Sequence, residues 1–177
     1  VRPDLAAYVL RAMIAWIPVS SHAATEASMT TLSRYAAIAN DIADTVVEAD
    51  DRIIPYRSWS LVDGKFEPLP ATDAQRVKTA FLMASIARYE SNFVAAVDSC
   101  ARPGDGGRAW GLWQVHAPKE QACASRRAGL RIALAMTTKS FRACGHLPEG
   151  DRLSVYATGS CFERQAESRA RVGLGAS

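Results

Sequence analysis

The stretch from Thr72 to Phe93, TDAQRVKTAFLMASIARYESNF, decides the fold. It opens with Thr72 and has Gln75 three residues on, which is the pattern of a capping box at the start of a helix. Apolar residues then follow densely as far as Tyr89. We therefore expect a largely buried helix that ends close to Glu90.

The segments on either side add further helices and one small β element. Amphipathic helices are expected at residues 5–19 and 28–49, from the spacing of their apolar residues. Between residues 52 and 71, prolines and the pair Asp63-Gly64 predict a short hairpin or irregular loop. Residues 94–115 read as a loop or small β-hairpin, and helices are expected near 125–141, 152–156 and 163–172.

Together these elements predict a mainly α (α+β) fold with a small β-hairpin. Residues 72–177 would form the main domain, and residues 1–71 would be a helical extension packed on it. The length of 177 residues fits one domain with a sizeable core, and 49% hydrophobic and 22% charged residues are ordinary for a globular protein.

Charge and hydropathy exclude some classes of protein. The net charge of +3 is mild; it fits an acidic polymer as partner, whereas nucleic-acid binding gets little support because no known reader motif is present. The apolar stretch Leu5–Val19 is interrupted by Arg11 and resembles a signal peptide poorly. It is also too short to cross a membrane, so no transmembrane segment is expected.

The four cysteines, Cys100, Cys123, Cys144 and Cys161, all lie in the C-terminal half. They form no Cys-x-x-Cys pair and have no matching His pair, which argues against a metal site. Among the possible disulfide connectivities we favour Cys100–Cys123 with Cys144–Cys161, because both close short loops around the motif segments. Such bridges imply an oxidising location outside the cytoplasm. Four buried free thiols are the alternative.

A single carboxylate stands out at the end of the expected helix. Glu90 lies between Tyr89 and Phe93 in the sequence and precedes a Gly-rich segment that contains Trp110 and Trp113. Burial beside such rings disfavours the charged form of a carboxylate, so the group keeps a proton that it can donate. An acid of this kind can protonate a glycosidic oxygen. The alternative is a solvated residue at a helix end.

Three short motifs resemble those of one family. They are Glu90-Ser91-x-Phe93, Gly111-Leu112-Trp113-Gln114, and Tyr156 within Val155-Tyr156-Ala157-Thr158-Gly159, and they look like the lytic transglycosylase and goose-type lysozyme superfamily. The resemblance runs from Thr72 to Cys161 and implies a lysozyme-like α fold. It also implies cleavage of the β-1,4 bond between N-acetylmuramic acid and N-acetylglucosamine in peptidoglycan, with no metal or cofactor.

The resemblance implies a role for each matching residue. Glu90 would be the catalytic acid, Ser91 would hold the reacting sugar or the carboxyl group, and Gln114 would contact the saccharide. Tyr156 would lie close to Glu90 and form a hydrogen bond with it. Two positions depart from the family pattern: Trp113 stands where Met is usual and Ala157 where Asn is usual, so the role of that Asn is unfilled.

Aromatic and histidine side chains of the Gly-rich segment could line a saccharide groove. Trp110 and Trp113 could stack on the faces of sugars, and packing in the core is the alternative for both. His116 could line the same groove, although a structural histidine is the more frequent case.

A second carboxylate decides between two reactions. A hydrolytic muramidase needs one within about 5–9.5 Å of the acid, and Asp98 and Asp105 lie in the right loop. A lytic transglycosylase needs none, because the C6 hydroxyl of the muramic acid attacks C1 itself. Asp105 stands in Pro103-Gly104-Asp105-Gly106-Gly107, which is more simply read as a turn. This favours the transglycosylase.

The expected partner is therefore peptidoglycan, and the expected location is extracytoplasmic, in the periplasm or cell wall, or on a virion. A larger assembly is a further possible partner. The rival from another class is a non-catalytic lysozyme-like module of a phage virion or secretion assembly. The presence of Glu90 argues against this rival, since a scaffold has no physical need for a carboxylate in an apolar groove.

Overall fold

The fold is mainly helical, with one two-stranded antiparallel sheet, as the sequence predicts. The structure is a computed structural model, and it describes residues 2–16, 28–162, 168 and 171–172. The elements run in the order α1 (Arg2–Trp16), α2 (Ser28–Glu48), η2 (Asp51–Ile53), β1 (Trp59–Val62), β2 (Lys65–Pro68), α3 (Asp73–Ser91), α4 (Ala95–Asp98), η3 (Asp105–Gly107), α5 (Lys119–Ala122), α6 (Arg126–Ala143), η4 (Glu149–Asp151) and α7 (Ser154–Thr158).

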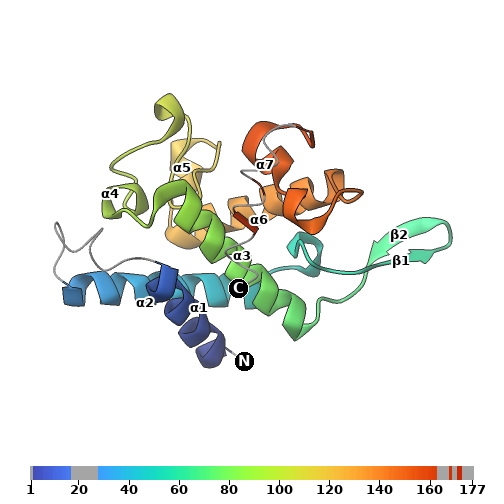
Figure 1. The fold of residues 1–177 in the computed structure, drawn as a ribbon, viewed down its shortest axis with the longest axis horizontal. Helices are drawn as coiled ribbons and strands as arrows, with labels where there is room; N and C mark the ends of the chain where they lie inside the picture. Colours follow the sequence, from blue (N-terminus) through green and yellow to red (C-terminus); the bar gives the residue numbers. More distant parts are fainter. Residues whose placement is uncertain (1, 17–27, 163–167, 169–170, 173–177) are drawn as a thin grey trace.

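Helix α3 runs through the middle of the molecule (Figure 1). Its capping box is confirmed: the Thr72 hydroxyl accepts from the Gln75 amide at 3.3 Å, and the Gln75 side chain accepts from the Thr72 amide at 2.9 Å. The helix ends at Asn92, whose left-handed backbone (φ 50°) lets its amide bond the Arg88 carbonyl. Leu82, Met83 and most residues up to Ala87 are buried, so the helix forms the centre of the core.

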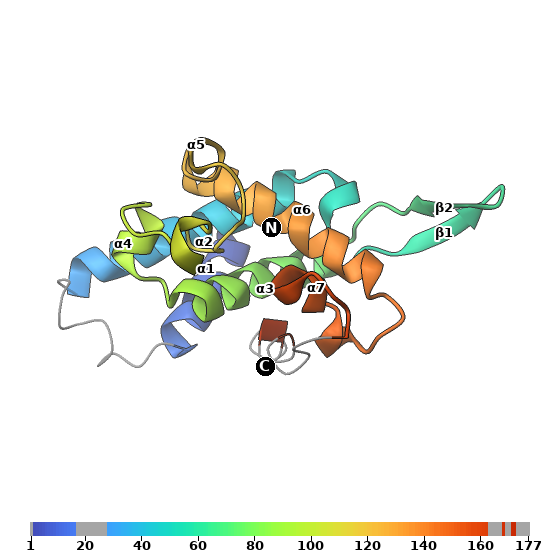
Figure 2. The same ribbon diagram turned by 90° about the horizontal axis from the view of Figure 1, so that it is seen from above.

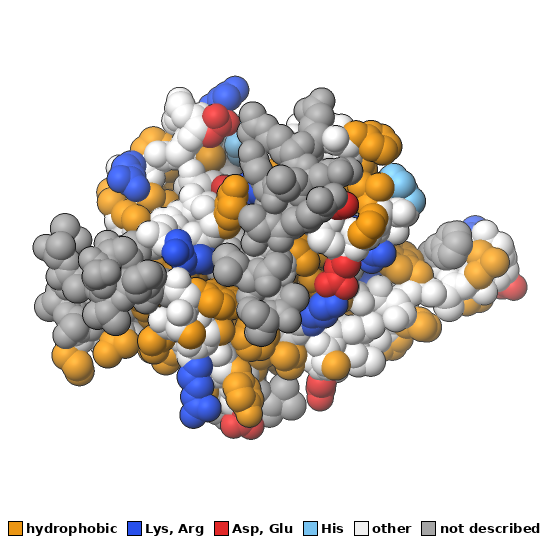
Figure 3. Space-filling model, in the orientation of Figure 1, with side chains coloured by type: hydrophobic (Ala, Val, Ile, Leu, Met, Phe, Trp, Pro, Cys, Tyr) orange, Lys and Arg blue, Asp and Glu red, His pale blue; other side chains and the backbone are white. Residues whose placement is uncertain are grey.

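Helices α1 and α2 pack against each other, and both contact α3, while α2 and α3 also contact α6 (Figures 1 and 2). One continuous apolar core joins all these helices. It includes Val9 of α1, Ile42 of α2, Ile86 of α3 and Leu134 of α6, all fully buried. The residues before Thr72 therefore share their core with the rest of the chain. Helices α1 and α2 also keep exposed apolar side chains, namely Tyr8, Ile14, Met29 and Leu32; Figure 3 shows apolar side chains at the surface of this face of the molecule.

Strands β1 and β2 form a hairpin that projects from the helical body (Figures 1 and 2). Their register pairs Trp59 with Pro68 and Val62 with Lys65. The turn consists of Asp63 and Gly64, both with positive φ (48° and 75°), which is the backbone that a two-residue hairpin turn requires. The second hairpin allowed for residues 94–115 is reduced to isolated bridges, Gly104 with Ala109 and Trp110 with Val115.

Both favoured disulfides are present. Cys100 is bonded to Cys123 and Cys144 to Cys161, with Cα atoms 6.1 and 5.5 Å apart. The first joins the loop after α4 to the end of α5, and the second joins the end of α6 to the segment after α7.

The remaining expectations for the elements have mixed outcomes. No helix within the described residues is long and apolar enough to cross a membrane. The helix expected at residues 5–19 corresponds to α1. Residues 17–19 of that expected range lie outside the described part of the chain. Most of the expected helix at 163–172 also lies outside it.

Candidate functional site

Glu90 lies at the C-terminal end of α3, one residue before the helix ends. Its carboxylate forms an ion pair with Arg171, whose Nη2 and Nε lie 2.6 and 2.8 Å from Oε1 of Glu90. The two side chains are 17% and 5% exposed. The Arg171 guanidinium also stacks on the Tyr89 ring, 4.1 Å from its centroid.

The surroundings of Glu90 thus differ from the purely apolar setting that the sequence predicts. The carboxylate is in direct contact with the guanidinium of Arg171. Sequence reasoning missed Arg171 because the contact joins residues 81 positions apart. No local spacing indicates such a pair.

Ser91 serves the end of the helix rather than a ligand. Its hydroxyl donates to the Ala87 carbonyl at 2.8 Å and accepts from the Phe93 amide at 3.3 Å. The side chain is buried. Phe93, which the sequence places beside Glu90, is fully buried in the core and packs on Tyr35 with ring centroids 5.7 Å apart.

The Gly-rich loop folds back on itself, and Gln114 closes it. The backbone of Gln114 is left-handed (φ 47°), and its side-chain Nε2 donates to the Gly111 carbonyl at 2.9 Å. Its Oε1 lies only 1.5 Å from where a Cβ on Gly104 would be, so a larger residue at that position would force the Gln114 side chain to move. The Gln114 side chain is partly exposed and remains a candidate for contact with a saccharide.

The two tryptophans of the loop have different roles. Trp113 is only 1% exposed, and its Nε1 donates to the Met83 carbonyl at 2.8 Å. The proposed stacking of Trp113 on a sugar is therefore wrong, because the ring is enclosed in the core and anchors the loop to α3. Trp110 is partly exposed, with the Lys119 ammonium 4.7 Å from its ring centroid, so it can still meet a ligand.

Tyr156 is brought to Glu90 from α7. Burial, and then the negative charge of Glu90, raise the pKa of the Tyr156 hydroxyl, while Arg171 opposes this. Such charge effects require the groups to be near neighbours. The hydroxyl donates to the Trp113 carbonyl at 2.6 Å rather than to Glu90 as expected. Tyr156 therefore ties the Gly111–Gln114 turn to α7 beside the carboxylate.

Asp98, a candidate second carboxylate, is engaged in a cluster of charged side chains. Its side chain is 5% exposed and forms a two-bond pair with Arg126, at 2.8 and 3.0 Å. Arg34 lies 3.5 Å away on the same carboxylate, and Asp41 binds Arg126 at 2.5 Å. This cluster holds the Asp98 carboxylate between α2 and α6, and a catalytic role for Asp98 stays a prediction.

Asp105 is exposed and lies in the turn that the sequence predicts. Its carboxylate contacts Arg108 at 3.1 Å and His116 at 3.3 Å. His116 is itself exposed, so its contact with Asp105 closes the turn at the surface. Among the described residues, no group of three or more His, Cys, Asp or Glu side chains could hold a metal ion.

The structure therefore links Tyr156 to the Gly111–Gln114 turn by a hydrogen bond, places Tyr156 within electrostatic reach of Glu90, and pairs Glu90 with Arg171. The side chains of Ser91 and Trp113 form hydrogen bonds with carbonyls of α3. Asp98 and Asp105 form ion pairs with arginines. Comparison of the chain with protein-family models, with curated proteins and with solved structures gives no match.

Proposed function

We propose that this protein is a lytic transglycosylase that cleaves the β-1,4 bond between N-acetylmuramic acid and N-acetylglucosamine in peptidoglycan. The observation that carries the proposal is the position of Tyr156, whose hydroxyl bonds the Trp113 carbonyl of the Gly111–Gln114 turn and whose pKa responds to the charge of Glu90. These three motifs lie far apart in the sequence. A link between them supports an acid at Glu90 with a supporting turn, as a single-acid glycosidase needs.

In the proposed reaction Glu90 acts twice. Its carboxyl group first donates a proton to the glycosidic oxygen, and the bond from that oxygen to C1 of the muramic acid breaks. The C6 hydroxyl of the same sugar then attacks C1, and the Glu90 carboxylate takes up the proton of that hydroxyl. No water is consumed, and the product is a 1,6-anhydro sugar. Glu90 ends in the protonated form in which it began.

A single acid is favoured because the two other candidates are engaged elsewhere. Asp98 is held by Arg126 and Arg34, and Asp105 by Arg108 and His116. Neither is free to activate a water molecule without giving up these partners. A hydrolytic muramidase, which needs such a group, is therefore the weaker candidate.

The Arg171–Glu90 ion pair bears on the mechanism. Arg171 contacts the Glu90 carboxylate directly. Proton donation in the first step requires Glu90 to leave Arg171 when the glycan binds. Tyr156 acts as a positioning residue, since its hydroxyl holds the carbonyl of Trp113 and, through it, the turn that carries Gln114.

The same ion pair favours one other candidate function. A carboxylate neutralised by a buried arginine also suits a non-catalytic lysozyme-like module of a phage virion or secretion assembly. In such a module the pair would only fasten residues near the C-terminus to α3. Under either reading, the two disulfides support a place of work in an oxidising environment, such as the periplasm, the cell wall or a virion.

The test is mass spectrometry of the fragments that the protein releases from purified peptidoglycan. We expect fragments ending in anhydro-muramic acid, one water lighter than hydrolysis products. Glu90→Gln should lower their yield by about 10²–10⁴-fold, the usual contribution of a general acid–base. Glu120→Gln, the same change at an exposed residue of α5, is the matched control and should cleave like the wild type.

Each other outcome supports a different function. Reducing-end products that depend on Glu90 would make the protein a muramidase. No Glu90-dependent product from protein with a native circular dichroism spectrum would refute catalysis and support the structural module.

A further inference from the structure

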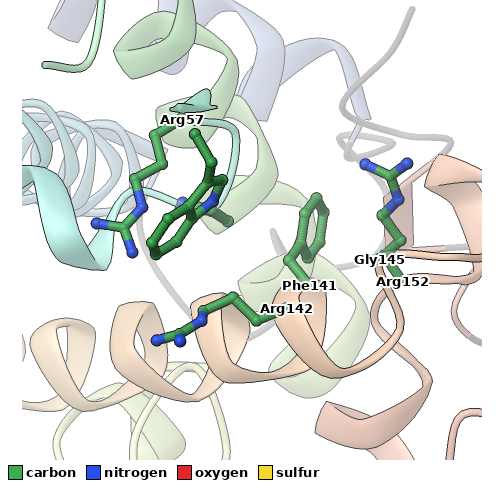
Figure 4. Close-up of a pocket in the computed structure, with 7 residues that line it drawn as sticks. Arg57, Phe141, Arg142, Gly145 and Arg152 are labelled. Atoms are coloured by element: carbon green, nitrogen blue, oxygen red, sulfur yellow. The ribbon is translucent and has the colours of Figure 1, made fainter. Parts of the chain in front are cut away.

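A pocket that does not include Glu90 lies between the start of the hairpin and the end of α6 (Figure 4). Its volume is about 420 Å³. Three arginines and two aromatic rings dominate its lining: Arg57, Arg142, Arg152, Trp59 and Phe141. None of these residues belongs to the candidate site around Glu90.

The arginines approach the pocket from three segments of the chain. Arg57 precedes β1, Arg142 lies in the last turn of α6, and Arg152 follows η4. Figure 4 shows Arg57 and Arg142 at one end and Arg152 beyond the ring of Phe141. Arg57 and Arg142 both stack on the Trp59 ring, 3.8 and 5.0 Å from its centroid. The fold thus holds two positive charges against one ring.

Arg57 is an unusual arginine for a surface pocket. It is only 6% exposed, and its Nε is buried with no hydrogen-bond partner among the described residues. Its Nη1 bonds only the Asp51 carbonyl, at 2.9 Å. Burying a charged donor without a partner is costly, so the position of Arg57 indicates a group that the pocket is built to receive.

The carboxylates nearest in the sequence do not fill this need. Asp51 is bound to Arg76 at 2.6 Å. Hydrogen bonds from Arg52 hold the pKa of the exposed Asp50 at about 2. Burial, and then the positive charge of Arg142, lower the pKa of Arg57. An anion in the pocket would offset the burial of Arg57 and its repulsion by Arg142.

We propose that this pocket binds an oxyanion, a carboxylate or phosphate group carried by a small ligand. The guanidinium groups of arginine match the planar geometry of such groups and form paired charged hydrogen bonds with them. Trp59 and Phe141 would cover the apolar part of the ligand. The site is independent of the proposed function, since it shares no residue with the surroundings of Glu90.

Titration calorimetry of the full chain with inorganic phosphate and with citrate, at constant ionic strength, tests the proposal. We expect saturable binding of at least one of them, with sodium chloride giving none. Tighter binding of phosphate would identify a phosphate-bearing ligand, and tighter binding of citrate a carboxylate-bearing one. Absence of saturable binding of both anions would overturn the proposal.

Matched variants locate the bound anion. Arg142→Gln changes an exposed side chain with no ion pair among the described residues, and it should weaken binding about tenfold or more. Arg131→Gln removes the same charge from the exposed side of α6, outside the pocket, and should leave binding unchanged. Equal losses in both variants would refute the site.

Two further variants complete the design. Arg57→Gln should also weaken binding, and if it does not fold, Arg142→Gln still decides the question. Glu90→Gln should bind both probes like the wild type. Failure of peptidoglycan cleavage therefore leaves the anion site intact as a proposal. Failure of anion binding likewise leaves the proposed cleavage intact.

Discussion

At the residue scale, Tyr56 illustrates how the fold tunes a single group. Its ring packs edge-on against Phe141, with centroids 5.1 Å apart, and the Lys78 ammonium lies 4.3 Å from its centroid. Burial, and then the negative charge and hydrogen bond of Glu149, raise the pKa of the Tyr56 hydroxyl, while Arg152 opposes this. The neutral phenol is therefore favoured in the folded state.

This shift makes stability depend on alkaline pH. Because the pKa of Tyr56 is higher in the folded than in the unfolded protein, its contribution is complete below about pH 10, the ordinary tyrosine value, and is lost as the pH rises further. In the wild type the free energy of unfolding should fall by up to about 1.4 kcal/mol per pH unit from this group alone.

The variant Tyr56→Phe has no phenol to ionise, so we expect its free energy of unfolding to fall less steeply. Guanidinium unfolding between pH 8 and about pH 11 measures the two slopes. Tyr8→Phe, at an exposed position of α1, is the control. Identical slopes for wild type and Tyr56→Phe would contradict the role assigned to Tyr56.

Glu90 is a second residue whose neighbours matter. Because of them, its role must be tested by analysing the reaction products. The sequence predicts an acid among aromatic rings, while the structure adds the cation of Arg171. The Glu90→Gln experiment decides whether this carboxylate is needed for cleavage.

At the scale of elements, the short helix α4 is fixed by charge. Asp98 at its end binds Arg126 at the start of α6, and Arg126 also binds Asp41 of α2. The hydrogen bonds that Arg126 donates to both aspartates raise its pKa, so it stays charged. A short helix of this kind has little stability of its own and depends on such contacts.

Asp98→Asn should therefore destabilise the protein by about 3 kcal/mol, because it leaves the partly buried Arg126 and Arg34 with less countercharge. The measurement is urea unfolding. Asp63→Asn, at the exposed tip of the hairpin, is the matched control and should change little.

The same variant separates structure from catalysis. At a temperature where Asp98→Asn is folded, its fragments from peptidoglycan should match those of the wild type. Loss of all product from the folded variant would restore Asp98 as a catalytic group and favour the muramidase.

At the scale of the whole molecule, the two disulfides fasten the segments that the core holds least. Cys100–Cys123 ties the loop after α4 to α5, and Cys144–Cys161 ties the segment after α7 to the end of α6. The pairs are separated by 23 and 17 residues. Cross-links of this length restrict the unfolded chain.

Replacing both cysteines of either pair by serine should lower the free energy of unfolding by about 3 kcal/mol. Chemical denaturation of each double variant measures this. A thiol assay of the unreduced, unfolded protein should find no free thiol, and four thiols there would refute the disulfides and the oxidising location inferred from them.

The sequence by itself determined the features that depend on neighbours along the chain. The capping box of Thr72 and Gln75, the Asp63-Gly64 turn and the helix that ends beside Glu90 follow from backbone preferences and spacing of a few residues. The two disulfides were also predicted, because both close short loops around the motif segments. Local rules suffice for such features.

Only the tertiary structure decided which side chains meet across the core. It placed Arg171 on Glu90, buried Trp113 against Met83, bound Asp98 to Arg126 and set Arg57 beside Arg142. Each of these contacts joins positions 28 to 85 residues apart. Their partners are chosen by how the helices pack, and no periodicity or short motif records that choice.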